Sequence, residues 1–309
     1  MLDPTPFFTK KLLLVTGKGG IGKSLVTAAL GQLAAERGLR TLLVENASQD
    51  QLGPLFGLPA LGHQESQIQP QLSCLNIGSE ENFREYVVKY LGQRMLYETV
   101  FSNRLVKSFM STVPGLAEVM LLGRLFYIAE LKEGERPDLV VFDAPASGHF
   151  MSLMTTPDAV LKSSLGGPLV RETERVNGFL ASPDKCAVLY VTVPEDLVVS
   201  EALEFLPRLA AASPARLGGV VVNRVPAPDP VLDELALQHP TPVSIYLEER
   251  RAAAREALQT LRLGLDELAR GSAALALATL PELGFIDEPL GRGFGERFLA
   301  GRGPAGGEV

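Results

Sequence analysis

The fold is decided by the stretch Leu12–Ser24, which reads LLLVTGKGGIGKS. It begins with a short, wholly apolar run, and such a run is typical of a parallel strand buried on both faces of a sheet. A glycine-rich segment follows, and residues 25–37 then have the apolar spacing of a helix that ends before Gly38. A second strand over residues 39–45 completes a βαβ unit. The stretch therefore predicts a parallel sheet with a helix packed against it.

Strands and helices continue to alternate along the chain. Apolar runs predict strands at residues 139–142, 187–193 and 219–222, and a helix over residues 197–212 joins the last two. This alternation favours the α/β class, with a mostly parallel sheet flanked by helices. Residues 79–131 depart from it, because they carry helical spacing without a strand pattern.

The composition limits the kinds of partner. The chain has 309 residues, of which 46% are hydrophobic and 21% charged, so a sizeable core is available. Its formal net charge of −7 argues against sequence-independent binding to the phosphate backbone of nucleic acid. The N-terminus lacks the layout of a signal peptide, and charged residues interrupt the most apolar helical stretch. We expect a cytoplasmic protein with no nucleic-acid partner and no membrane insertion.

The glycine-rich segment fits the phosphate-binding pattern G-x-x-x-x-G-K-[ST] at every position and lies between a predicted strand and a predicted helix. Lys23 would reach the β- and γ-phosphates, and the Ser24 hydroxyl would bind Mg²⁺. Backbone N–H groups of the turn and of the helix N-terminus would hold the phosphates. The expected nucleotide-binding residues are Gly17, Gly19, Gly20, Ile21, Gly22, Lys23, Ser24 and Leu25.

A carboxylate at the end of a neighbouring strand would complete a magnesium-nucleotide site. Asp143 directly follows the predicted strand 139–142, where its side chain could hold a magnesium-bound water. We therefore predict ATP and Mg²⁺ as cofactors, with Ser24 and Asp143 at the metal.

Lys18, directly after the first glycine, gives the loop a second lysine. The segment Gly17–Ser24 resembles the deviant Walker A loop of the SIMIBI class of dimeric ATPases. This class includes the ArsA arsenite-pump ATPase, the ATPase that targets tail-anchored proteins, and MinD and ParA switches. The resemblance implies that Lys18 reaches across a face-to-face dimer to the partner's phosphates. The alternative is a solvated loop lysine.

Two further elements resemble the ArsA and tail-anchored-targeting branch. Asp143–His149 is similar to its switch II, in which Gly148 would sense the γ-phosphate; for His149 a packed or hydrogen-bonded role is favoured over a catalytic one. Asn223 follows a strand, as does the asparagine whose amide reads the adenine in that family. The alternative for Asn223 is a residue of an ordinary turn. The resemblance covers about residues 11–250.

Switch I, residues 44–52 here, departs from the family pattern. Alignment on Leu52 places Ala47 where the family has an aspartate that orients the attacking water. Alanine cannot do this, so ATP hydrolysis is expected to be weak unless Asp50 or Glu45 replaces that group. We take Asp50 as the candidate, and Lys18, Lys23 and Asp50 are the predicted catalytic residues.

The two cysteines, Cys74 and Cys186, lie far apart. The chain therefore has neither the zinc-binding C-x-x-C of the tail-anchored-targeting dimers nor the cysteine cluster of an arsenite pump, and neither function is expected. The expected function is a dimeric ATP/ADP switch, homodimeric or paired with a paralogue, that drives or gates a protein client of unknown identity. The alternatives are a hydrolysis-impaired ATP-binding subunit that pairs with an active paralogue, and a ParA- or MinD-like positioning ATPase.

The chain is expected to form one phosphate-loop ATPase domain over residues 1–300. A helical insertion would occupy about residues 79–135, between switch I and Asp143. Beyond Val243 the composition predicts helix through about Leu280. The glycine-rich residues 301–309 have the composition of a flexible tail.

Overall fold

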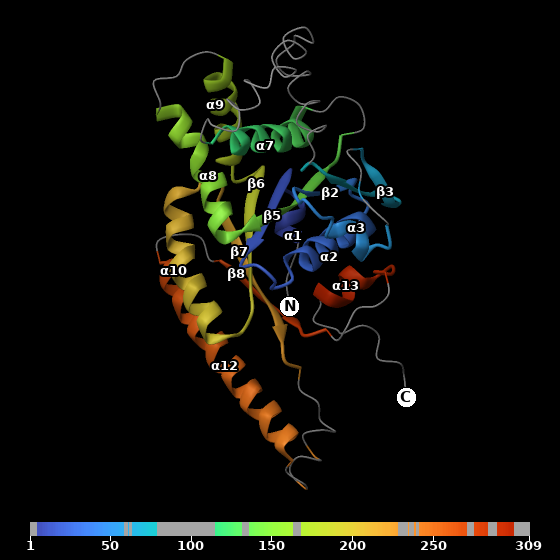
Figure 1. Ribbon diagram of the computed structural model, residues 1–309, viewed down its shortest axis with the longest axis vertical. Helices are drawn as coiled ribbons and strands as arrows, with labels where there is room; N and C mark the ends of the chain where they lie inside the picture. Colours follow the sequence, from blue (N-terminus) through green and yellow to red (C-terminus); the bar gives the residue numbers. More distant parts are fainter. Residues whose placement is uncertain are drawn as a thin grey trace.

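A computed structural model gives the architecture of the chain (Figure 1). It describes residues 5–58, 61, 64–78, 115–131, 136–162, 168–227, 234, 238, 241–270, 275–283 and 289–299. An eight-stranded sheet runs through the centre in the order β3-β4-β2-β5-β1-β6-β7-β8. All neighbouring strands are parallel except β3 and β4, which are antiparallel. The predicted α/β class is confirmed.

The central strand is the one that carries the phosphate-loop motif. β1 is fully buried, as its apolar sequence predicts, and pairs with β5 on one side and β6 on the other. The carboxyl ends of the three strands therefore meet at one edge of the sheet. The strand bounds are β1 Leu12–Gly17, β2 Thr41–Glu45, β3 Ser66–Gln69, β4 Leu72–Asn76, β5 Leu139–Ala146, β6 Cys186–Thr192, β7 Leu217–Val225 and β8 Ala276–Pro281.

One face of the sheet is covered by the helix that follows the loop. This helix, α2 (Lys23–Glu36), buries Val26, Leu30 and their neighbours against alternate residues of β1, β2 and β5. Three short helices, α1 (Thr5–Phe8), α3 (Leu52–Leu55) and α13 (Phe294–Leu299), contribute to the same core. Figure 1 shows α2, α3 and α13 on this side of the sheet.

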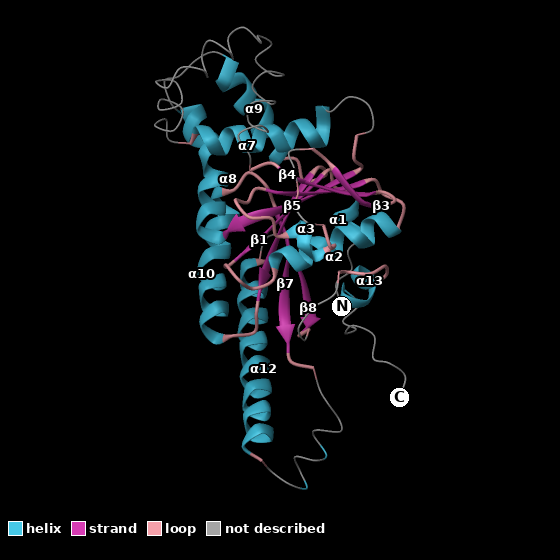
Figure 2. Cartoon of the chain, turned by 45° about the vertical axis from the view of Figure 1, so that its right-hand side comes forward, coloured by secondary structure: helices cyan, strands magenta, loops and turns pink. Residues whose placement is uncertain are grey.

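The other face carries the longer helices, whose apolar side chains form a second core. α7 continues directly into a π-helical turn, Tyr127–Leu131, and α8 follows β5 without a break. On this face α10 contacts both α8 and α12, and Figure 2 shows α7 and α9 at one end of these helices. Their bounds are α7 Leu116–Phe126, α8 Ser147–Lys162, α9 Pro168–Leu180, α10 Asp196–Ala212 and α12 Pro242–Leu268. No helix in the described ranges is both long and apolar enough to cross a membrane.

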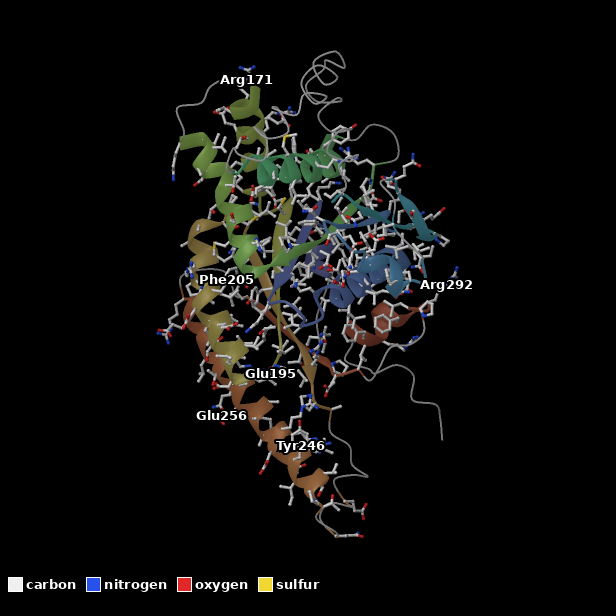
Figure 3. All side chains as sticks on the ribbon, viewed as in Figure 1. Arg171, Glu195, Phe205, Tyr246, Glu256 and Arg292 are labelled. Atoms are coloured by element: carbon white, nitrogen blue, oxygen red, sulfur yellow. The ribbon has the colours of Figure 1, made fainter. Side chains whose placement is uncertain are left out.

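Helix α12 projects beyond the sheet at its N-terminal end, where Thr241 and Ser244 form a capping box (Figures 1 and 2). Tyr246, labelled in Figure 3, lies on this projecting part and is 60% exposed. An ion pair of 2.7 Å between Arg250 and Glu282 ties the helix to the chain that follows β8.

Two features of the sequence prediction need correction, and a third lies largely outside the described residues. The expected helix through Leu280 ends at Leu268, and residues 276–281 form β8 instead, because they pair with β7. The edge strand β3, its neighbour β4 and the helix α13 were not predicted. Of the expected insertion at 79–135, residues 79–114 and 132–135 lie outside the described residues, as does the tail at 301–309.

Candidate functional site

The phosphate loop fills the turn between the central strand and α2. Gly17 lies so close to β6 that an added Cβ would be 2.1 Å from the Val191 carbonyl oxygen. Gly22 is the residue before α2 and has φ of 93°, in the left-handed region that favours glycine. An added Cβ there would be 2.4 Å from Nδ2 of Asn223. Glycine is therefore required at both positions, because the Val191 carbonyl and the Asn223 side chain leave no room for a Cβ.

Two successive residues at the end of β7 hold this loop. Asn223, which is buried, donates from Nδ2 to the Ile21 carbonyl oxygen at 2.8 Å. Arg224 donates from its guanidinium to the Gly20 carbonyl oxygen, also at 2.8 Å. The structure thus brings Asn223 to the predicted loop, where its amide nitrogen is engaged by the loop backbone. Arg224 was not foreseen from the sequence.

The polar side chains at the start of α2 meet the end of β5. The Ser24 hydroxyl donates to Oδ2 of Asp143 at 2.6 Å, and Nζ of Lys23 donates to the Lys18 carbonyl oxygen at 3.1 Å. Burial lowers the pKa of Lys23, and the nearby charge of Asp143 opposes this. Burial raises the pKa of Asp143, against the Ser24 hydrogen bond, the charge of Lys23 and the nearby Thr27 hydroxyl. A serine, a lysine and a carboxylate therefore converge beside the loop.

These residues suit a magnesium ion that is bound together with nucleotide phosphates. Oδ1 of Asp143 is buried without a hydrogen-bond partner, so a hydrated cation would satisfy it. Among the described residues, no group of three or more His, Cys, Asp or Glu could hold a metal ion. Mg²⁺ does not need such a cage, since it commonly binds one or two carboxylates, phosphate oxygens and several waters.

The second lysine of the loop points to a different element. Nζ of Lys18 forms an ion pair of 2.6 Å with Oε2 of Glu201 on α10, and both side chains are partly exposed. Within this chain, Lys18 is therefore bound to α10.

Glu45, the last residue of β2, lies in the first part of switch I. Oε2 of Glu45 accepts from the backbone N–H groups of Gln51 at 2.9 Å and Leu52 at 3.1 Å, whereas Oε1 is buried without a partner. Burial raises the pKa of Glu45 to about 7; these two N–H groups oppose the shift, and the charges of Asp50 and Asp143 add to it.

The predicted catalytic Asp50 is bound away from the phosphate loop. Its Oδ2 accepts from the Leu61 N–H at 2.6 Å, and its Oδ1 accepts from Asn76 Nδ2 at 2.7 Å. Asn76 also donates to the Ala47 carbonyl oxygen at 2.9 Å. The hydrogen bonds of Asp50 therefore fix the shape of switch I.

Switch II leaves the sheet beside the phosphate loop. The Thr16 hydroxyl on β1 donates to the Pro145 carbonyl oxygen at 2.8 Å, which ties the two segments together. Gly148 and His149 are exposed, so His149 is not packed, and a hydrogen-bonded role for it stays a prediction.

The sheet order, the strand–loop–helix turn and the carboxylate at the end of the neighbouring strand define a phosphate-loop nucleotide-binding fold. The model of the anion-transporting ATPase family matches residues 10–166, about half of the chain. The chain belongs to this family, as its motifs indicated.

Two relatives illustrate the range of similarity. ATPase BagA of Mycobacterium tuberculosis is 34% identical over 232 residues, which are 70% of this chain and 66% of that protein. ATPase ASNA1 homolog 1 of Paramecium tetraurelia is 29% identical over 157 residues, which are 50% of this chain and 46% of that protein. The matched part thus spans just under two thirds of the first relative and under half of the second.

Four residues of the site were not assigned a bonding partner from the sequence. They are Glu45 and Asn76, which bond to switch I, Arg224, which bonds to the loop backbone, and Glu201, which pairs with Lys18. A signal for two of them exists in the strand ends. Aligning the carboxyl ends of β4, β2 and β5 puts Asn76, Glu45 and Asp143 in one row, since Glu45 is in register with both of the others. Glu201 could not be found in this way, because it lies on a helix.

Proposed function

We propose that this chain binds Mg²⁺-ATP at residues 17–25 and hydrolyses it as a nucleotide-dependent dimeric switch that drives or gates a partner protein. The observation that carries the proposal is the 2.6 Å hydrogen bond between Ser24 and Asp143, which joins the loop to the neighbouring strand. Magnesium held there would neutralise charge on the phosphates during transfer. The family, in which several relatives bear the name ATPase, supports the same activity.

Each part of the loop has a separate task in this proposal. The backbone N–H groups from Gly17 to Leu25 hold phosphate oxygens, and the ammonium of Lys23 leaves the Lys18 carbonyl to bind the β- and γ-phosphates. Ser24 and Asp143 hold the hydrated metal. Asn223 keeps the loop in shape and lies beside it, where its side-chain oxygen could face the adenine.

Calorimetry with ATP and Mg²⁺ tests the binding step. Lys23→Ala removes the main cationic contact to the terminal phosphates, so we expect the affinity for ATP to fall by at least about tenfold. Lys162→Ala is the control, because Lys162 is an exposed lysine of α8 whose partner is Asp158. Equal binding of ATP by Lys23→Ala and the parent would rule out this site.

A hydrolysis-impaired ATP-binding subunit is the second candidate. It is favoured by Ala47 in switch I and by Asp50, both of whose carboxylate oxygens already accept hydrogen bonds from Leu61 and Asn76. Such a subunit would bind ATP as proposed, and a paralogue would supply the missing group. Turnover measured on the purified chain separates the two candidates.

A further inference from the structure

The end of β2 places a second acidic side chain next to Asp143. Glu45 and Asp143 are paired in register on adjacent parallel strands, which lie about 4.8 Å apart. Leu43 and Val141, two residues earlier on each strand, both belong to the core beneath α2. Because side chains alternate along a strand, Glu45 and Asp143 face the same side, where α2 begins with Lys23 and Ser24.

Each of these two carboxyl groups has one oxygen in use and one without a partner. Oε2 of Glu45 accepts from Gln51 and Leu52, and Oδ2 of Asp143 accepts from Ser24. Oε1 of Glu45 and Oδ1 of Asp143 are buried without a hydrogen bond, and Glu45 is only 1% exposed. Buried acceptors that lack a donor are unfavourable, so two of them on neighbouring strands indicate a missing common partner.

We propose that Glu45 is a second carboxylate of the magnesium site, which together with Asp143 accepts hydrogen bonds from the waters of nucleotide-bound Mg²⁺. This inference rests on the proposed function. Hydrated Mg²⁺ is rich in donors and is commonly held by one or two carboxylates beside phosphates. Asp50 does not compete for this role, because both of its oxygens are bonded to Asn76 and Leu61.

The same carboxylate joins the metal to switch I. Its other oxygen holds the N–H groups of Gln51 and Leu52, where α3 begins. Glu45 is therefore a positioning residue that links the occupancy of the metal site to the loop between β2 and α3. Asp143 has no such connection, since its second oxygen is bonded to Ser24 on α2.

Calorimetry with ADP, once with Mg²⁺ and once with EDTA, measures the contribution of the metal apart from catalysis. We expect Mg²⁺ to tighten ADP binding by the parent. Glu45→Gln should lose about tenfold or more of this metal-dependent gain, as outer-shell changes at metal sites do. Its affinity for ADP in EDTA should match that of the parent, because Glu45 does not contact the phosphates in this arrangement.

Glu36→Gln is a matched control. Oε1 of Glu36 also accepts a backbone N–H, from Gly293 at 2.7 Å, but Glu36 lies at the opposite end of α2. This variant should keep the whole metal-dependent gain. Glu45→Gln retains an oxygen that can accept from Gln51 and Leu52, so it is expected to fold, and its circular dichroism should match that of the parent. Glu45→Asp, which keeps the charge on a shorter side chain, should lose less of the gain than Glu45→Gln.

The outcomes distinguish this inference from the proposed function. Full retention of the Mg²⁺-dependent gain by Glu45→Gln would overturn the role of Glu45 while leaving the nucleotide site intact. No binding of ADP by the folded parent, with or without Mg²⁺, would overturn the proposed nucleotide site and the role of Glu45 together.

Discussion

Glu45 ionises in a buried position, and this makes the stability of the nucleotide-free protein depend on pH. Its pKa is raised from an ordinary value of 4.5 to about 7 by burial, with Asp50 and Asp143 as the charged groups that face it. The folded state therefore binds the proton more tightly than the unfolded state. The contribution of Glu45 to the free energy of unfolding is therefore complete below about pH 4.5. Between about pH 4.5 and pH 7 it falls by up to roughly 1.4 kcal/mol per pH unit.

Glu45→Gln removes this titration. Chemical unfolding at pH 5 and pH 8, with no nucleotide or metal present, should show a smaller loss of stability over this interval in the variant than in the parent. At pH 8 the variant should be the more stable of the two. The same loss of stability in both proteins would show that Glu45 ionises normally.

Ala47 leads to a prediction about the rate of hydrolysis. If Ala47 occupies the position of the water-orienting acid, the parent should bind ATP and hydrolyse it slowly. Ala47→Asp should then raise turnover, by on the order of 10²-fold for a well-placed base, with little change in the affinity for ATP. Single-turnover assays of the parent and variant measure this.

Asp50→Ala is the comparison for that experiment. Brisk hydrolysis by the parent that Asp50→Ala abolishes without loss of ATP binding would make Asp50 the switch I acid. Slow hydrolysis that neither substitution changes would support the hydrolysis-impaired subunit. In the structure, Asp50→Ala also removes the two hydrogen bonds to Leu61 and Asn76, so its unfolding temperature belongs in the comparison.

At the scale of the elements, the packing at Gly17 is too tight for a side chain, because β6 lies directly against the end of β1. A Cβ at this residue would be 2.1 Å from the Val191 carbonyl oxygen, and φ is 150°. We expect Gly17→Ala to lower the free energy of unfolding by about 2–4 kcal/mol, since strands of the central sheet would have to separate.

Gly19→Ala is the control for this effect. An added Cβ at Gly19 has no atom within 4 Å, so its stability should stay within about 0.5 kcal/mol of the parent. The measurement is the thermal unfolding temperature of each variant without nucleotide, and we expect it to be lower for Gly17→Ala than for Gly19→Ala. Equal unfolding temperatures would show that the sheet can widen beside the loop.

The elements also show which parts of the fold the sequence could predict. The central strands were predictable because burial on both faces demands continuous apolar runs such as Leu139–Phe142. β8 was not, because its alanines and leucines suit a helix and only pairing with β7 makes it a strand. β3 is a short, largely polar edge strand, Ser66–Gln69, so its sequence carries little hydrophobic pattern.

In the candidate site, too, only the features that are local in sequence could be predicted. The convergence of Ser24 and Asp143 follows from the loop motif and the end of a strand, both of which are local in sequence. The bonds of Asp50 to Asn76 and of Lys18 to Glu201 join residues from distant elements. They depend on strand register and on the rotation of a helix, which no local pattern encodes.

At the scale of the whole molecule, the proposed dimer would require Lys18 to leave its ion pair with Glu201. In the proposed dimer this lysine would reach the partner's phosphates, yet here it is paired with Glu201 at 2.6 Å. Lys18→Ala should weaken the nucleotide-dependent dimer and leave ATP affinity largely intact. Glu201→Gln should shift dimerisation to lower protein concentration, because no ion pair has to be broken first.

Sedimentation velocity with a non-hydrolysable ATP analogue measures both effects. Glu130→Gln is a matched control, since it breaks the Lys185–Glu130 pair, which has the same length of 2.6 Å and does not involve the phosphate loop. A parent that stays monomeric under saturating nucleotide would exclude the homodimer and leave a paralogue as the partner.

The hold that Asn223 and Arg224 exert on the phosphate loop has a consequence for synthesis on the ribosome. These two hydrogen bonds join positions 202 and 204 residues apart in sequence. The loop is therefore translated well before β7, yet these two hydrogen bonds can form only after β7 has emerged. A nascent chain released before that point would carry the whole phosphate-binding motif without the residues that shape it, so cellular ATP should stabilise only chains whose translation has passed β7.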